Sequence, residues 1–241
     1  MRDDIFEVYG THRNTHPVSC VKPSVKQVCN IDATNLHDLE KLVLKLNPHV
    51  IINCIGMLPQ ADEKCRHMFV MINSLLPQKI SSLCSQMGSR FIHISTDGVF
   101  DGKRGDYTES DNVSPRGFYN LSKAVGETHE NNKLAVTLRV APTGLEILGK
   151  RRTLFGWFLS EVKRAIAENS PRTINGFHHY IFNGVTNVCL GKLVLLIILE
   201  FPDLHGVVHV GGEPISKYEL LKLLITKLNC GVSKFTNILH V

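Results

Sequence analysis

Two short stretches decide the fold: residues 90–97 read RFIHISTD, and residues 119–123 read YNLSK. The first is an apolar run typical of a buried strand, and it ends in two hydroxyls and a carboxylate. The second is helix-like, so Tyr119 and Lys123 are expected one turn apart on the same helix face. Together they predict a cluster of polar groups where the strand ends.

On either side of these stretches, β-rich runs alternate with helical periodicity. Strands are predicted at residues 6–11, 25–28, 50–54, 90–95 and 135–140. Helices are predicted at residues 34–46, 65–87 and 118–131, with Thr34 as a cap and a break at Pro77. This alternation predicts an α/β fold with a Rossmann-like, doubly wound parallel sheet, whose ligands bind beyond the carboxyl ends of the strands.

The pattern loosens after residue 143, with helices predicted at residues 155–167 and 187–201 and a strand at 207–210. We therefore expect an NAD(P)-binding part at residues 1–142 and a smaller substrate-binding lobe, packed on it, at residues 143–241. A second Tyr-x-x-x-Lys match, Tyr218 and Lys222, follows Ser216 and precedes a leucine-rich run. Ser216 and Glu219 form a capping-box pattern, so this match is interpreted as an ordinary amphipathic helix.

Composition favours a soluble protein: of 241 residues, 43% are apolar and 20% are charged. Seven cysteines without a Cys-x-x-Cys pair favour reduced thiols and a cytoplasmic location, with Cys54 and Cys84 as buried small side chains. The formal charge of +5 is spread out, and only residues 150–152 form a tight basic cluster. Nucleic-acid binding is not indicated, and the longest apolar run, residues 193–199, is too short to span a bilayer.

The arrangement of Thr96, Tyr119 and Lys123 suits proton delivery to a carbonyl. A cation near a phenol stabilises the phenolate and lowers a pKa that is ordinarily about 10. Thr96 would donate a hydrogen bond to the same carbonyl oxygen. A hydride would have to come from a cofactor, because no side chain supplies one.

Simpler interpretations compete with this one. Tyr119 and Lys123 could be an exposed helical pair, and Thr96 a hydroxyl capping a loop. A hydrolase triad of His93, Ser95 and Asp97 is disfavoured because no Gly-x-Ser-x-Gly elbow surrounds the serine. No metal site is predicted, since the histidine pair at residues 178–179 has no carboxylate or cysteine at a convincing spacing.

The chain resembles the dTDP-4-dehydrorhamnose reductases, extended short-chain dehydrogenase/reductases that act on nucleotide sugars. The resemblance covers roughly residues 5–228 and is carried by residues 93–102 (HISTDGVFDG), 107–109 (YTE), 119–127 (YNLSKAVGE), 47–54 (NPHVIINC) and the ID pair at 31–32. It implies reduction of a 4-keto group on a deoxysugar nucleotide, for surface polysaccharide synthesis. Epimerase chemistry on a nucleotide sugar at the same cleft is left open.

By this resemblance, the catalytic residues are Thr96, Tyr119 and Lys123, and the last two also contact the cofactor. The remaining cofactor-binding residues it implies are Arg13, Ile31, Asp32, Cys54, Ile55 and Gly56. The implied cofactor is NADP or NAD, with NADPH favoured because the Arg13 guanidinium suits a phosphate. The partners would be a nucleotide-sugar substrate and either a second copy of the chain or a partner enzyme.

Relatives in this family begin with a strand and a Gly-x-x-Gly-x-x-Gly turn, whereas this chain starts after that unit. Without that strand, the strand at residues 50–54 is expected to border a gap. Gly98 also stands where the family often has Tyr. Three explanations stay open: a truncated or wrongly started product, a non-catalytic relative similar to the regulatory subunit of methionine adenosyltransferase, or a second chain that fills the gap.

Overall fold

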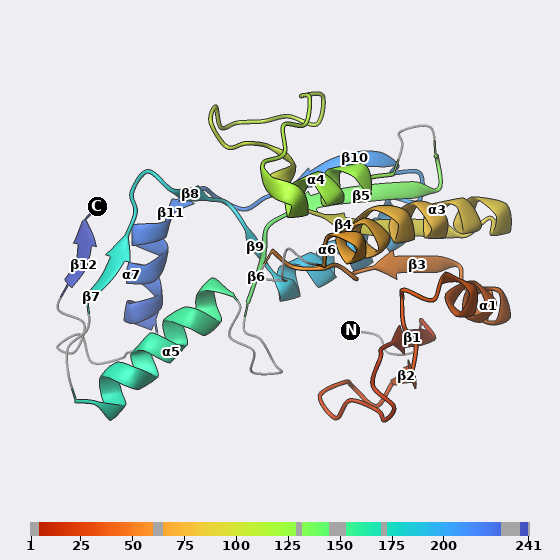
Figure 1. The fold of residues 1–241 in the computed structure, drawn as a ribbon, viewed down its shortest axis with the longest axis horizontal. Coiled ribbons are helices and arrows are strands. Elements are labelled where there is room, and N and C mark those ends of the chain that lie inside the picture. The colour runs from red at the N-terminus through yellow and green to blue at the C-terminus, as the bar shows by residue number, and fades with distance from the viewer. Residues whose placement is uncertain are drawn as a thin grey trace. The chain divides into compact units, whose positions relative to one another are not determined.

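The computed structural model describes residues 5–59, 65–128, 132–144, 153–169, 173–227 and 237–240. The chain divides into two compact units, the first of residues 1–139 with 203–209 and the second of residues 140–202 with 210–241 (Figure 1). The basic cluster at residues 150–152 lies outside the described residues. No helix in these described ranges is both long and apolar enough to cross a membrane.

A four-stranded sheet forms the centre of the first unit, in the order β10-β5-β4-β3 (Figure 1). Its strands are β3 (Val50–Asn53), β4 (Arg90–Ser95), β5 (Ala135–Val140) and β10 (Gly206–Val210). The pairs β3–β4 and β4–β5 are parallel, which requires the helical crossovers that lie between them in sequence. The α/β class and the strands predicted at these positions are confirmed.

Two further predicted strands, β1 (Val8–Thr11) and β2 (Val25–Val28), pair with each other in parallel as a separate sheet. Among the described strands, none pairs with the outer edge of β3, as expected for the strand at residues 50–54. Burial of that strand was expected, but Ile52 is 44% exposed. An edge strand lacks a neighbour on one side, which explains this exposure.

Helix α1 (Leu36–Leu46) begins later than predicted. Its cap is Asn35, whose side chain accepts a hydrogen bond from the backbone N–H of Asp38 at 3.2 Å. Thr34 instead donates its hydroxyl to Asp32 at 2.8 Å. Threonine and asparagine are both common N-cap residues, so the sequence alone could not show whether Thr34 or Asn35 caps the helix.

The long helix predicted at residues 65–87 consists of α2 (Arg66–Phe69), a π-helical segment η2 (Val70–Leu75) and α3 (Leu76–Met87). The irregularity therefore precedes Pro77, which lies in the first turn of α3. Proline lacks an N–H and its ring crowds the carbonyl four residues earlier, here that of Asn73. A wider π turn accommodates both effects and keeps the helix continuous.

Helix α4 (Gly117–Val125) is shorter than the helix predicted at residues 118–131, of which 129–131 lie outside the described residues. At its end, a Cβ on Gly126 would lie 1.8 Å from the backbone oxygen of Asn73. This close approach fixes α4 against η2. The core beneath them is formed by Ala33, Leu39, Ile72, Leu76, Ile80, Cys84, Phe91 and Ala135.

The second unit contains α5 (Leu154–Ala167), α6 (Asn187–Glu200) and α7 (Lys217–Lys227), so its predicted helices are confirmed. Its short strand pairs are β6–β9 (Pro142–Thr143 with Val185–Thr186), β8–β11 (Ile181–Phe182 with Ile215–Ser216) and β7–β12 (Thr173–Gly176 with Asn237–His240). The capping box is also confirmed, since Ser216 accepts from the Glu219 N–H at 3.1 Å and donates its hydroxyl to the Glu219 carboxylate. A separate core contains Phe158, Val162, Ala165, Ile174, Leu221 and Ile225.

The close approach of Gly126 to Asn73 predicts that two glycine-to-alanine variants will differ greatly in their free energy of unfolding. Gly126→Ala would lower the free energy of unfolding by about 1–3 kcal/mol, because a backbone carbonyl cannot rotate away from the added methyl. Gly191→Ala is the control: it lies in α6 with nothing within 4 Å of its Cβ position, and we expect a gain of about 0.5–1 kcal/mol. Urea denaturation measures both, and equal stabilities would contradict the close approach.

Candidate active site

Thr96 lies at the carboxyl end of β4, where the chain enters the short helix η3 (Asp97–Val99). Its hydroxyl oxygen accepts the N–H of Gly98 at 3.1 Å and donates to the Asp97 carboxylate at 3.1 Å. The hydroxyl is thus held in place by its own turn. Thr96 caps a loop, as the simpler interpretation expected, yet it also contacts the helix opposite.

Tyr119 of α4 has the side chain of Thr96 near its phenol, close enough to affect the pKa of the phenol. Its ring meets Phe69 edge-on, with centroids 6.4 Å apart. Burial raises the pKa of Tyr119, the nearby Thr96 side chain lowers it in part, and the Asp97 carboxylate raises it further. The expected lowering of this pKa by Lys123 was therefore wrong: desolvation outweighs the effect of Thr96, and the phenol keeps its proton at neutral pH.

Lys123 is buried, and its ammonium donates to the backbone carbonyl of Ile94 at 2.6 Å. Burial lowers the pKa of Lys123 to about 8, although the negative groups of Glu127 and Cys54 favour its charged form. A backbone carbonyl is thus the direct partner of the amine. The structure places the Thr96 side chain near the Tyr119 phenol, and it places Lys123 one turn further along the same helix.

A buried ion pair supports this region. The Arg139 guanidinium donates to both oxygens of Glu127 at 2.9 and 2.8 Å, with side chains 7% and 9% exposed. Ser95 also donates its hydroxyl to Glu127 at 2.8 Å. Sequence reasoning noticed these residues only as part of a pattern; an arginine within the apolar run of β5 was the signal that could have identified the pair.

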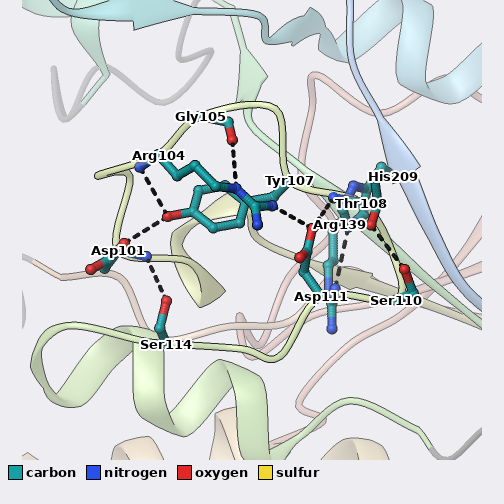
Figure 2. Close-up of polar contacts among 10 residues, drawn as sticks. All are labelled: Asp101, Arg104, Gly105, Tyr107, Thr108, Ser110, Asp111, Ser114, Arg139 and His209. Atoms are coloured by element: carbon teal, nitrogen blue, oxygen red, sulfur yellow. Dashed lines mark hydrogen bonds and ion pairs between the residues drawn. The ribbon is translucent and has the colours of Figure 1, made fainter.

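The loop after η3 is fastened by its own polar and aromatic side chains (Figure 2). Tyr107 donates its hydroxyl to Asp101 at 2.7 Å and stacks on Phe100 with centroids 4.4 Å apart. Arg104 pairs with Asp111 at 2.6 Å and lies over the Tyr107 ring. These contacts order a glycine-rich stretch that starts next to Thr96.

The ordered loop also reaches the sheet. Glu109 accepts the backbone N–H of His209 at 2.8 Å, and this hydrogen bond lowers the pKa of the Glu109 carboxyl. Arg139 contacts His209 at 3.2 Å (Figure 2). It also lies over the Phe100 ring, 5.1 Å from its centroid. The Tyr-Thr-Glu motif at residues 107–109 therefore ties the loop to β10 through Glu109.

The segment Cys54–Gly56 follows the carboxyl end of β3. Strand β3 pairs in parallel with β4, the strand that Thr96 follows. Asn53 accepts the Ile55 N–H at 3.0 Å, which shapes the turn. Cys54 is exposed rather than buried, so the expectation of a buried small side chain was wrong for it. Its influence on the pKa of Lys123 indicates that the thiol and the amine are close.

Arg13, Ile31 and Asp32 lie just beyond β1 and β2. The Ile31 N–H donates to the His12 carbonyl at 3.0 Å, and the Arg13 charge contributes to a lowered pKa of Asp32, after the larger effect of hydrogen bonds from Thr34. Ile31 packs on the first core. The structure thus brings Arg13 and Asp32 close together at the ends of the β1–β2 pair.

The second unit contains a pocket of about 500 Å³ lined by Leu154, Phe177, His179, Tyr180, Phe182, Lys217 and Leu220. The Lys217 ammonium lies over the Phe177 ring, 4.8 Å from its centroid. No group of three or more metal-ligating side chains occurs in the described part of the chain.

Residues 6–145 match the family described as "RmlD substrate binding domain". This match covers more than half of the chain, so the chain belongs to that family, and the resemblance seen in the sequence is confirmed at family level.

Three similar proteins illustrate the range of its relatives. Methionine adenosyltransferase 2 subunit beta of Rattus norvegicus is 32% identical over 216 residues, which are 86% of this chain and 63% of that protein. The dTDP-4-dehydrorhamnose reductase of Mycobacterium tuberculosis is 36% identical over 84 residues, or 32% of this chain and 28% of the reductase. The Bacillus anthracis dTDP-4-dehydrorhamnose reductase, solved in complex with NADP, has a TM-score of 0.71 at 22% identity, covering 92% of this chain and 77% of that one. The chain therefore spans less than two thirds of the length of its adenosyltransferase relative.

The buried ion pair predicts that Arg139→Leu will lower the free energy of unfolding by about 3–5 kcal/mol, because Glu127 is left charged and unpaired. Glu127→Leu/Arg139→Leu would recover most of this loss. Arg104→Leu, which breaks a pair whose arginine is 58% exposed, is the control and should cost about 1 kcal/mol or less. Urea denaturation compares the three, and an Arg139→Leu cost no larger than the control would refute the buried pair's role.

Proposed function

We propose that this chain carries the active site of an NAD(P)H-dependent reductase that converts a 4-keto group of a deoxysugar nucleotide to an alcohol. The closeness of the Thr96 side chain to the Tyr119 phenol, one helical turn from the buried amine of Lys123, is the observation that carries this proposal. A hydroxyl and a phenol are thereby brought together at the sheet edge where α/β proteins bind ligands.

In this proposal each residue has its own role. Tyr119 donates a proton to the carbonyl oxygen, which suits a phenol whose raised pKa keeps it protonated at neutral pH. Thr96 donates a hydrogen bond to the same oxygen as negative charge develops on it. Lys123, one turn further along the same helix, would hold a ribose hydroxyl of the cofactor.

A nicotinamide cofactor would supply the hydride. The residues available fit such a group: Cys54, Ile55 and Gly56 form the turn beside Thr96, and Ile31, Asp32 and Arg13 cluster beyond β1 and β2. An arginine suits the extra phosphate of NADP, while an aspartate suits a ribose hydroxyl. We favour NADPH because Arg13 supplies the phosphate-binding charge.

The substrate assignment comes from the reductase relatives, whose names specify a nucleotide sugar. We propose that residues 143–241 form the substrate-binding part and that their aromatic pocket, with Lys217, receives the nucleotide base. Reduction of such a sugar would serve surface polysaccharide synthesis in the cytoplasm. Epimerase chemistry at the same hydroxyl–phenol pair is an alternative outcome.

A second candidate function is a binding subunit of an enzyme. The similarity to methionine adenosyltransferase 2 subunit beta extends over 216 residues, against 84 for the Mycobacterium tuberculosis reductase. In that case, the chain would act through contact with a partner enzyme and would not turn over a sugar.

The test is NADPH oxidation by the purified chain with dTDP-4-dehydrorhamnose as substrate, with NADH in parallel. Tyr119→Phe should lower kcat by about 10²-fold or more, because the proton donor is lost, while KM changes little. Tyr218→Phe is the control, since this tyrosine belongs to the second Tyr-x-x-x-Lys match, in α7.

The outcomes separate the candidates. Turnover that survives in Tyr119→Phe would reject the proton-donor role. No turnover with either cofactor, together with stable co-purification with the catalytic subunit of a methionine adenosyltransferase, would favour the binding-subunit function instead.

A further inference from the structure

The turn that carries Thr96 and the helix that carries Tyr119 meet at a second point. Gly98 of η3 lies against Asn120 of α4: a Cβ built on Gly98 would be 2.3 Å from Asn120 Oδ1 and 2.9 Å from its Cγ. These distances are far shorter than any normal contact of a methyl group. The amide oxygen therefore occupies the space that a side chain at position 98 would need.

Backbone conformation does not explain this glycine. Gly98 is not in the left-handed region, unlike Gly102 and Gly105 further along the loop. Other residues could adopt its backbone angles, so the requirement for glycine arises from the closeness of Asn120.

The Asn120 amide is held in a fixed orientation. Its Nδ2 donates to the backbone carbonyl of Arg116, one turn earlier, at 2.8 Å. Because that bond points the nitrogen towards Arg116, the oxygen faces Gly98. A methyl group at position 98 would have to break this bond or push the turn away from the helix.

The two contacts join the same pair of elements. Thr96 and Gly98 are two residues apart, and Tyr119 and Asn120 are neighbours, so a shift at one contact moves the other. We propose that the Gly98–Asn120 contact is a positioning device that holds the turn of Thr96 against α4 and so keeps the Thr96 side chain close to the Tyr119 phenol. Asn120 is thus a positioning residue that acts through Thr96 and Tyr119. Its effect on catalysis rests on the proposed function.

The test uses three variants: Gly98→Ala, Asn120→Ala and the double variant. Each single variant should move the Thr96 side chain away from the Tyr119 phenol, the first by a clash and the second by leaving a void. In the double variant the alanine methyl takes the place of the lost amide oxygen, so the fit is restored. Asn120→Ala creates no clash and tests the contact even where Gly98→Ala does not fold.

The first measurement is the pKa of Tyr119, followed by the ultraviolet absorbance change of tyrosine ionisation during a pH titration. The chain has five tyrosines, so the titration curve of Tyr119→Phe is subtracted to remove the signal of the other four. The groups that face this phenol are Thr96, Asp97 and the Phe69 ring, with Lys123 on its own helix. The ring stays packed on Phe69 while the Thr96 side chain, which lowers the pKa of Tyr119, moves away. The pKa of Tyr119 should therefore rise in both single variants and return in the double variant.

The second measurement is turnover. Each single variant should lower kcat about tenfold with KM within about twofold, and the double variant should return to within about threefold of the parent protein. Gly191→Ala, with open space at its Cβ position, and Leu121→Ala, 47% exposed on the same helix as Asn120, are the controls.

An unchanged pKa of Tyr119 in both single variants, or a double variant no better than the worse single variant, would overturn the proposal. The pKa measurement needs neither substrate nor cofactor. A protein without reductase activity would therefore contradict the proposed function, while the titration of Tyr119 would still support or overturn the positioning contact.

Discussion

The site depends on one buried hydrogen bond, from the Lys123 ammonium to the carbonyl of Ile94 at 2.6 Å. An amine is costly to bury, so its position must be fixed by the groups around it. Ile94 belongs to β4, two residues before Thr96, and Lys123 belongs to α4, one turn after Tyr119. This single bond therefore ties the strand that presents the hydroxyl to the helix that presents the phenol.

Three further contacts keep these elements together. The carbonyl of Asn73 in the π segment approaches Gly126, the Arg139–Glu127 pair anchors Ser95, and Asn120 fits over Gly98. The arrangement would serve either a reductase or a subunit that retains the fold of one, which explains why the two candidate functions share a sequence pattern.

The sequence alone correctly predicted β4, β5 and the capping box at Ser216, because each follows from local periodicity or a short pattern. It also predicted that Thr96 and Tyr119 would lie near each other, and Thr96 is close enough to affect the pKa of Tyr119. It did not predict the direct partner of Lys123, since a backbone carbonyl leaves no signature in the residue types. The exposure of Ile52 and the contact of Gly98 with Asn120 depend on which elements become neighbours, and this is a property of packing rather than of local sequence.

The most direct test of this arrangement is the pKa of Lys123, measured by nuclear magnetic resonance of its labelled side-chain ε-carbon across a pH titration of the folded chain. Lys123→Met would assign the signal. Burial against the Ile94 carbonyl predicts a pKa of about 8. A value near the ordinary lysine pKa of about 10.4 would mean that the amine is solvated, and the central contact would then be wrong.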